Sequence, residues 1–300
     1  MNPMRTSVVV ASVPASYLAK VRRGERPTPE EGLDFLCAWH AAHPGATAQS
    51  VSERRFADGR NSYELLASCV PAGADASVLD LGCGDGLLTS LLAGRLGEGA
   101  RILGVDASED DLVLARARGC PPRVRFSCEL ASAMSPATAS VDAVLCHWAL
   151  MLFVPLDPVV AEIARVLAPG GTFAAVVPSM WSIGSVSPEL QALVAEVRAA
   201  DLPGFPDLGL VEPRFATEGA GAFFRRDTGF EVPVEITTHT ATSRWDRATL
   251  VGSFHHAYWF DMLREESRAR LLAEATRLLA PLPEPVEVQT EMRLIVARRG

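Results

Sequence analysis

Three glycines at alternate positions form the motif whose chemistry is clearest. Gly82, Gly84 and Gly86 follow an apolar run that ends at Leu81 and precede a helix-like stretch. Glycine allows a tight turn and lets a ligand approach the backbone closely. The start of the next helix offers unpaired N–H groups and the positive end of its dipole, which favour a carboxylate or phosphate. A dinucleotide fingerprint needs glycine at position 87, where Leu87 stands, so the spacing argues against NAD.

An acidic residue follows this turn at the distance expected for ribose binding. Asp106 ends the next apolar segment, about 20 residues after the glycines, where a carboxylate can accept hydrogen bonds from both ribose hydroxyls. Alternatively, Asp106 caps the helix that follows, but Ser108 is the better cap. Asp106 is therefore expected to bind a ribose.

Short apolar strands that alternate with helices must position these residues. The expected strands are Ser77–Leu81, Arg101–Val105, Arg123–Phe126, Val141–Cys146 and Thr172–Val177. The helices between them are expected at 85–96, at 108–118 and from 157 to Pro169-Gly170-Gly171. This alternation predicts an α/β, doubly wound fold with a parallel sheet covered on both faces.

The two ends of the chain differ from this pattern. The first 70 residues read as helical, with a capping box at Thr28-Pro29-Glu30-Glu31 and a helix at Ser62–Cys69. After the fifth strand we expect a helix at 188–200, an aromatic loop at 203–229, strands at 230–240 and 286–298, and a helical stretch at 247–279. The expected organisation is a helical N-terminal extension or lid at 1–70 and a main domain at 71–300, with a lid insertion at about 181–229.

Four motifs, in order and at normal spacing, resemble those of the class I S-adenosylmethionine-dependent methyltransferases. They are Asp80-x-Gly82-x-Gly84-x-Gly86, Gly104-Val105-Asp106, Ser140-Val141-Asp142 and Leu167-Ala168-Pro169-Gly170-Gly171. The resemblance covers 62–178, and more weakly the strand pair within 230–298. It implies a Rossmann-like, mostly parallel seven-stranded sheet, with S-adenosyl-L-methionine as the cofactor.

The resemblance also implies which residues contact the cofactor. From the first two motifs these are Asp80, Gly82, Cys83, Gly84, Gly86, Asp106 and Ala107. In the family, an acidic residue followed by a small one after the third strand contacts the adenine. Glu129-Leu130 is the nearest match, with glutamate in place of aspartate. The alternative is that Glu129 is a solvated loop acid.

The candidate catalytic residue is His147, at the end of the expected fourth strand. Ligands of open α/β sheets bind beyond the carboxyl ends of the strands, where strand order reverses, and in this family that point lies between the first and fourth strands. A neutral imidazole there could accept the proton of a hydroxyl acceptor, with kcat falling at acid pH near its ordinary pKa of roughly 6.5. Alternatively, His147 packs on the methionine part of the cofactor or donates a structural hydrogen bond.

Aromatic residues and histidines gather in the expected lid regions. The candidates for a substrate pocket are Tyr63, Trp148, Trp181, His255 and Tyr258. Methyl transfer to a small, partly apolar acceptor needs a dry enclosure, although aromatics at helical spacing also fill cores. His255-His256 could bind a divalent ion with His147 or Asp261, but adjacent helical residues point about 100 degrees apart, so no metal is expected.

Composition narrows the class of partner. The net charge is −8 and no basic tract is present, which argues against nucleic acid and anionic membranes. No apolar run reaches the ~18–20 residues that span a bilayer, and Pro14 interrupts the leader-like start. The six cysteines form no C-x-x-C pair, which favours buried thiols in a reducing cytoplasm.

The predicted function is methyl transfer to a small-molecule acceptor by a monomer or homodimer, in bacterial secondary metabolism. Lys20 is the single lysine among 28 basic residues, as expected of a GC-rich bacterial genome. Two alternatives keep the cofactor: a rearrangement or cyclisation without methylation, and a catalytically silent partner subunit. Transfer to O, N or C stays open, although Cys146-His147-Trp148-Ala149 in place of an N-P-P-Y motif disfavours planar amides and similar amino groups.

Overall fold

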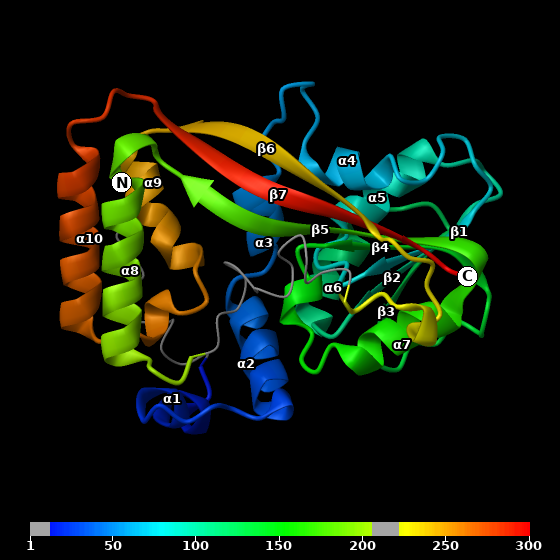
Figure 1. Cartoon of the computed structure of the whole chain (residues 1–300), viewed down its shortest axis with the longest axis horizontal. Helices are drawn as coiled ribbons and strands as arrows, with labels where there is room; N and C mark the ends of the chain where they lie inside the picture. Colours follow the sequence, from blue (N-terminus) through cyan, green and yellow to red (C-terminus); the bar gives the residue numbers. More distant parts are fainter. Residues whose placement is uncertain (1–12, 206–221) are drawn as a thin grey trace. The chain divides into compact units, whose positions relative to one another are not determined.

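The computed structural model of this chain describes residues 13–205 and 222–300 (Figure 1). Within them we distinguish a sheet unit, made of the described residues of 47–180, 208–241 and 290–300, and a helical unit, made of those of 1–46, 181–207 and 242–289. Residues 1–12, which make up most of the leader-like start, and most of the expected loop at 203–229 lie outside the described residues.

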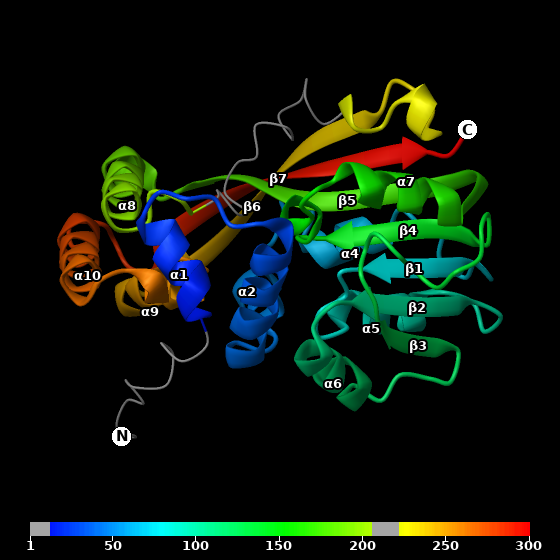
Figure 2. The ribbon, with the colours of Figure 1, turned by 90° about the horizontal axis from the view of Figure 1, so that it is seen from below.

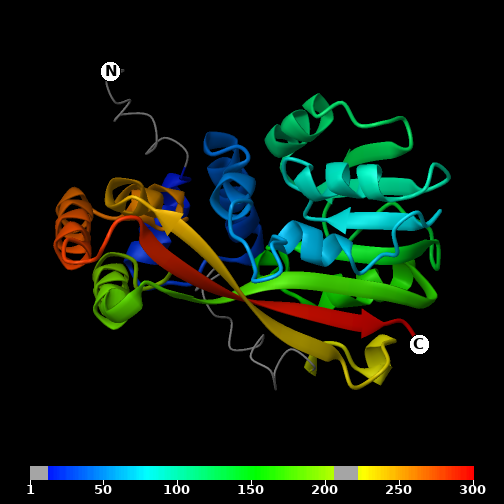
Figure 3. The same ribbon diagram turned by 90° about the horizontal axis from the view of Figure 1, so that it is seen from above.

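One seven-stranded sheet is formed by the described residues, in the order β3-β2-β1-β4-β5-β7-β6 (Figure 2). The strands are β1 Ser77–Leu81, β2 Arg101–Asp106, β3 Val124–Cys128, β4 Val141–His147, β5 Leu167–Ser182, β6 Glu235–Trp245 and β7 Val286–Arg298. β1 to β5 pair in parallel, whereas β7 runs in the opposite direction to β5 and β6 (Figures 1 to 3). The predicted mostly parallel, doubly wound α/β fold is confirmed.

Alternate residues of the central strands pack into opposite layers. In β4, Val144 and Cys146 belong to the core that includes α7, whereas Ala143 and Leu145 belong to the core that includes α4 and α5. The helices named here and their neighbours are α3 Ala46–Val51, α4 Ser62–Ala67, α5 Leu87–Arg95, α6 Glu109–Ala117 and α7 Asp157–Val166. A strand covered on both faces needs apolar side chains at every position, which explains the continuous apolar runs of the sequence.

The helical unit is built from segments distant in the sequence. Its helices are α1 Ala15–Arg22, α2 Pro29–Ala42, α8 Ser187–Asp201, α9 Arg247–Gly252 and α10 Glu265–Leu279. α2 begins at the predicted capping box: Thr28 Oγ1 accepts the N–H of Glu31 at 3.3 Å, and the Glu31 carboxylate accepts the N–H of Thr28 at 2.8 Å. Tyr17 and Phe35 stack with ring centroids 4.5 Å apart and join α1 to α2.

The fifth strand differs from its prediction. β5 begins at Leu167 instead of Thr172, so the Pro169-Gly170-Gly171 turn expected before the strand lies inside it. The register against β4 shifts at this point, and the backbone of Arg299 bonds to Gly170 and Gly171 at 2.8 and 2.9 Å. The segment is therefore a bulge within the sheet, held by the residue after β7.

Several element boundaries also differ. α5 begins at Leu87 instead of 85 because Gly86 has a φ of +77°, outside the helical region. The stretch 247–279 breaks into α9, short 3₁₀ turns at Ser253–His256 and Phe260–Met262, and α10. β6 begins at Glu235, and the strand expected from 230 is represented there by one isolated bridge between Phe230 and Arg299.

The division into units does not follow the expected boundary at residue 70. Residues 47–70 belong to the sheet unit, and 242–289 belong to the helical unit with the N-terminal helices. Contacts with sequence-distant segments set this division, and local patterns do not report them. The role of the N-terminal helices and of 181–229 as a lid stays a prediction.

Candidate functional site

The glycine turn is tied to the neighbouring strand by its backbone. The N–H groups of Gly82 and Cys83 donate to the carbonyl of Val105 at 2.8 and 3.0 Å, and the N–H of Gly86 donates to that of Cys83 at 2.9 Å. Gly82, Gly84 and Gly86 have φ values of +69°, +51° and +77°. Only glycine adopts this left-handed backbone readily, so the spacing of the glycines sets the shape of the turn.

The three glycines differ in what surrounds them. A Cβ at Gly82 would lie 2.5 Å from the Cβ of Ala149, and one at Gly86 would lie 2.8 Å from the Cβ of Ala115. A Cβ at Gly84 would meet nothing within 4 Å. The outer glycines therefore permit close packing of the turn, whereas the middle one borders open space that a ligand could enter.

Asp106, at the end of β2, faces this middle glycine. Its Oδ2 accepts the N–H of Gly84 at 2.8 Å, and its Oδ1 accepts the N–H of Ser108 at 2.9 Å. The predicted cap residue, Ser108, also accepts the N–H of Asp111 at 3.3 Å at the start of α6. Both carboxylate oxygens are thus fixed in orientation, and each has lone pairs for further donors such as hydroxyls.

Asp80, in β1, is a buried carboxyl with one unused oxygen. Its Oδ2 accepts the hydroxyl of Thr89 at 2.6 Å, while its Oδ1 has no hydrogen-bond partner among the described residues. Burial raises the pKa of Asp80 to about 7, and the charge of Asp106 adds to this effect. A cationic donor placed at Oδ1 would satisfy it, so Asp80 fits a ligand with an ammonium group. Sequence reasoning missed the role of Thr89, because only the packing of α5 on β1 brings it to Asp80.

The expected adenine contact follows β3. The N–H of Glu129 donates to the carbonyl of Asp106 at 3.0 Å, which places both residues at the same edge of the sheet. The Glu129 carboxylate accepts the N–H of Ser135 at 2.6 Å. Burial by itself raises the pKa of Glu129, but hydrogen bonds from Ser127 and Ser135 hold it below its ordinary value. The side chain of Leu130 is 47% exposed, an apolar surface that a planar ring could cover.

Cys83 and Ala107 offer backbone and packing surface at the same edge. Burial raises the pKa of the Cys83 thiol well above its ordinary value, so the thiol stays protonated. The carbonyl of Ala107 accepts the thiol of Cys128 at 3.6 Å. We therefore expect no nucleophilic chemistry at Cys83.

His147, at the end of β4, is held inside the protein. Its side chain is buried, its Nε2 lies 2.9 Å from Ser62 Oγ, and its ring stacks on that of Tyr63 with centroids 3.7 Å apart. Burial lowers its pKa to about 3. The expectation that His147 titrates near its ordinary pKa of roughly 6.5 does not fit this environment, which instead favours the alternative of packing and a structural hydrogen bond. The contact with Ser62 could not be read from the sequence, since it depends on how α4 packs against β4.

Trp148 follows His147 and has an unusual backbone. Its φ is +53°, and its indole Nε1 is buried with no hydrogen-bond partner among the described residues. The guanidinium carbon of Arg54 lies 5.6 Å from the centroid of the Trp148 ring. Sequence reasoning missed Arg54, because a pair of arginines after a helix is typical of a solvent-exposed surface.

The five predicted substrate-pocket residues divide between the two units. Tyr63 and Trp148 lie in the sheet unit beside the end of β4, whereas the remaining three, Trp181, His255 and Tyr258, lie in the helical unit. In the helical unit the Tyr258 hydroxyl lies 3.1 Å from His40 Nε2, and the His255 ring packs edge-on against Phe260. Their shared role in one pocket stays a prediction.

Two further observations concern other kinds of site. In the described parts of the chain, no three His, Cys, Asp or Glu side chains come together as a metal would need. In the same residues no helix is both long and apolar enough to span a bilayer.

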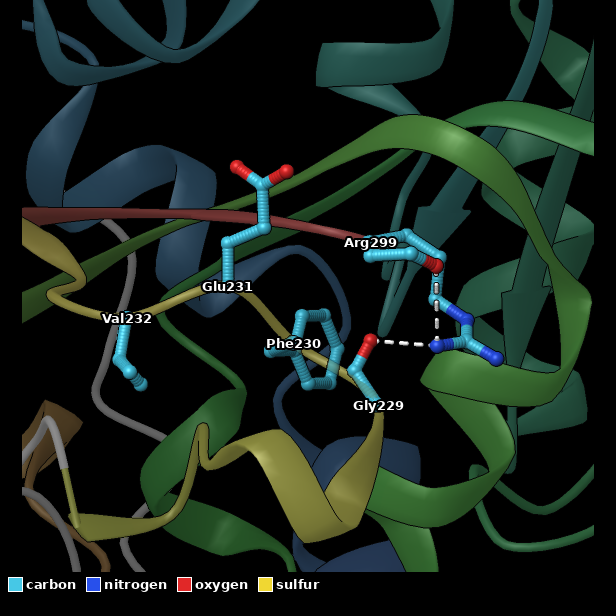
Figure 4. Close-up of a pocket in the computed structure, with 6 residues that line it drawn as sticks. Gly229, Phe230, Glu231, Val232 and Arg299 are labelled. Atoms are coloured by element: carbon cyan, nitrogen blue, oxygen red, sulfur yellow. Dashed lines mark hydrogen bonds between the residues drawn. The ribbon is translucent and has the colours of Figure 1, made fainter.

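A surface hollow lies where the segment 229–232 meets Arg299 (Figure 4). It has a volume of about 500 Å³ and is lined by Gly229, Phe230, Glu231, Val232, Arg299 and Gly300. Arg299 bonds through its backbone to Gly170 and Gly171 near the start of β5, whereas Asp106 and His147 lie at the carboxyl ends of their strands. The Arg299 guanidinium donates to the carbonyls of Ala164 and Gly229, so we assign it a structural role.

Comparison with known proteins agrees with this geometry. Residues 78–171 match the family model of a methyltransferase domain. A trans-aconitate 2-methyltransferase of Delftia acidovorans is 32% identical over 253 residues, an alignment that covers 75% of this chain and 92% of that protein. The chain belongs to the class I S-adenosylmethionine-dependent methyltransferases. The family membership expected from the four motifs is confirmed, and the cofactor of this methyltransferase is S-adenosylmethionine.

Two other proteins are similar over most of the methyltransferase. Nocamycin O-methyltransferase of Saccharothrix syringae is 30% identical over 228 residues, which are 71% of this chain and 80% of that protein. The structure of a putative type II methyltransferase from Anaeromyxobacter dehalogenans has a TM-score of 0.57 and 26% identity, and the match covers 82% of this chain and 97% of that one. Alignments with several other trans-aconitate 2-methyltransferases cover about half of their length.

Proposed function

We propose that this methyltransferase transfers the methyl group of S-adenosylmethionine to a small-molecule acceptor. The observation that carries the proposal is the cofactor edge, which we define as Asp80, the glycine turn 82–86 and Asp106. The open space at Gly84 lies beside the oriented carboxylate of Asp106, and Asp80, in the strand that leads into the glycine turn, has a buried oxygen without a hydrogen-bond partner among the described residues. The names of the Delftia acidovorans and Saccharothrix syringae relatives support a small acceptor.

Each residue of the cofactor edge has a distinct role in this proposal. Asp106 accepts the ribose hydroxyls, because its oxygens are oriented by backbone N–H groups. Gly84 lets the ligand reach the backbone, and Asp80 Oδ1 accepts the ammonium group of the methionine part. Glu129 and Leu130 border the adenine, with Leu130 covering its face and Glu129 holding the loop through Ser135.

The reaction needs alignment more than proton transfer. S-adenosylmethionine supplies an electrophilic methyl group on a sulfonium. The chain orients the acceptor toward that methyl and excludes water, and such alignment can account for most of the acceleration. His147 is neutral, buried and bonded to Ser62, so it supports the edge of the site through packing. This arrangement suits an acceptor that is already anionic, since such an acceptor needs no general base.

Mass spectrometry of reaction products tests this proposal. The protein is incubated with S-adenosylmethionine and candidate acceptors, and the products are examined for the addition of one methyl group with formation of S-adenosylhomocysteine. A product with rearranged bonds and unchanged mass would replace the proposal with a rearrangement or cyclisation. Cofactor binding without turnover of any acceptor would indicate a silent partner subunit.

The biological setting forms a further part of the proposal. The name of the nocamycin relative supports a role in bacterial secondary metabolism. The cytoplasmic location, the absence of a metal from the reaction and the state of monomer or homodimer stay predictions. Genomic neighbours that encode a biosynthetic pathway would support the proposed setting, and their chemistry would identify candidate acceptors.

A further inference from the structure

Arg54, between α3 and α4, is a partly buried cation without an acidic partner. Its Nε donates to the carbonyl of Ser50 at 3.0 Å, and its Nη1 donates to Thr290 Oγ1 at 2.7 Å. Within residues 13–205 and 222–300, no aspartate or glutamate forms an ion pair with Arg54. Burial lowers its pKa to about 10, so it stays charged at neutral pH. A cation withdrawn from water is costly unless an anion compensates it.

Trp148, beneath Arg54, and the neighbouring His147 also have unused hydrogen-bond donors. Trp148 lies under the guanidinium in a left-handed backbone conformation, which is rare for a bulky residue and persists only where the surroundings impose it. Its Nε1 is buried and makes no hydrogen bond with the described residues, and the same is true of Nδ1 of His147. Indole and guanidinium nitrogens donate only, and the imidazole donates in one tautomer. A ligand rich in acceptor oxygens would satisfy all three groups.

Trp148 and His147 lie beside the cofactor edge. Trp148 stands between His147, the last residue of β4, and Ala149, whose Cβ sits where a side chain at Gly82 would be. β4 pairs in parallel with β1, so both strands end at the same edge of the sheet. All of these residues, with Arg54 and Thr290, belong to the sheet unit.

From this arrangement we infer that Arg54 binds a carboxylate of the acceptor above the ring of Trp148 and thereby selects carboxylate-bearing acceptors. The guanidinium matches a carboxylate in geometry and charge, and its planar fork can make two parallel hydrogen bonds. Thr290 Oγ1 and the carbonyl of Ser50 hold the fork in orientation. The inference rests on the proposed function and names the class of acceptor and the residue that recognises it.

Calorimetry of the protein loaded with S-adenosylhomocysteine tests the inference. The probes are a panel of small mono-, di- and tricarboxylates that begins with trans-aconitate, together with their uncharged methyl esters. We expect carboxylates to bind the wild type more tightly than their esters. Arg54→Met keeps an apolar stem but loses the charge, and should weaken carboxylate binding roughly 10- to 100-fold with little effect on the esters. Arg55→Met removes the same charge from the exposed neighbouring residue and should change neither carboxylate binding nor ester binding.

Thermal unfolding separates recognition from a purely structural role. Because the Arg54 guanidinium lacks an anion, Arg54→Met should leave the Tm of the ligand-free protein unchanged or raise it. A binding carboxylate should then raise the Tm of the wild type but not that of Arg54→Met. Arg54→Lys keeps the charge and loses the fork, so it should fold and bind carboxylates several-fold more weakly than the wild type.

Three results would overturn the inference. They are equal carboxylate affinities of the wild type and Arg54→Lys or Arg54→Met, a lowered Tm with equal loss of ester and carboxylate binding, and failure of every carboxylate to bind the wild type. Failure to bind S-adenosylhomocysteine at all would instead contradict the proposed function.

Discussion

At the scale of single residues, burial decides what each titratable group near the site can do. Asp80 and His147 are both buried, and both are pushed toward their neutral forms. Asp106 has its orientation set by two backbone N–H groups instead. Residue type alone would have assigned acid–base chemistry to His147, whereas its surroundings favour a structural role.

Protonation of His147 should destabilise the fold. Its pKa of about 3 lies below the ordinary value of roughly 6.5, so the unfolded chain binds the proton more readily than the folded chain does. The free energy of unfolding should therefore fall as the pH drops from 6.5 toward 3, by at most about 1.4 kcal/mol per pH unit. Urea unfolding between pH 7 and pH 5 checks this. In His147→Phe, which retains a stacked ring, the free energy of unfolding should lack this pH dependence. An equal pH dependence in both proteins would show that His147 is not the source of it.

Asp80 should have the opposite effect. Its pKa is raised to about 7, so the stability from its neutral form is complete at low pH and is lost as the pH rises through 7. Asp80→Asn mimics the neutral carboxyl and should flatten this dependence, with a higher free energy of unfolding than the wild type at pH 8, by about 1–3 kcal/mol. Denaturant titrations at pH 5 and pH 8 measure it. A variant less stable than the wild type at pH 8 would mean that the charged carboxylate is required.

At the scale of elements, local signals were read correctly where one segment determines its own structure. The capping box at Thr28 and the strand at Ser77–Leu81 lie where the sequence placed them. The bulge in β5 was missed because it depends on Arg299, far along the chain. The same limit applies to the site: the glycine turn and Asp106 could be predicted, while Arg54 and Ser62 required knowledge of which helices meet β4.

Substitutions in the glycine turn should separate its structural and binding functions. Gly84→Ala borders open space and costs only the strain of a left-handed alanine, about 1–2 kcal/mol, so the protein should fold but bind S-adenosylmethionine poorly. Gly86→Ala places a methyl group against Ala115 and should lower the Tm more strongly. Thermal unfolding with and without cofactor distinguishes the two. Equal losses of Tm in Gly84→Ala and Gly86→Ala would show that the open space at Gly84 does not distinguish it from Gly86.

At the scale of the whole molecule, net charge and local charge oppose each other. The chain carries a net charge of −8 and should repel an anionic acceptor at long range. Within the binding site, Arg54 attracts the carboxylate of the acceptor. Salt screens distant surface charges more than a partly buried cation. For a carboxylate acceptor, kcat/KM should therefore rise by about twofold between low and physiological ionic strength. Initial rates at several salt concentrations test this, and a fall in kcat/KM would mean that exposed cations attract the acceptor.

The central claim is that Asp106 and the glycine turn bind S-adenosylmethionine, and calorimetric titration with Asp106→Ala tests it most directly. Loss of the charge-assisted hydrogen bonds to the ribose should weaken binding by roughly 1.5–3 kcal/mol. Asp110→Ala, an exposed acid in the first turn of α6, is the matched control and should bind as the wild type does. Dissociation constants that are the same for wild type, Asp106→Ala and Asp110→Ala would contradict the account and remove Asp106 from the site.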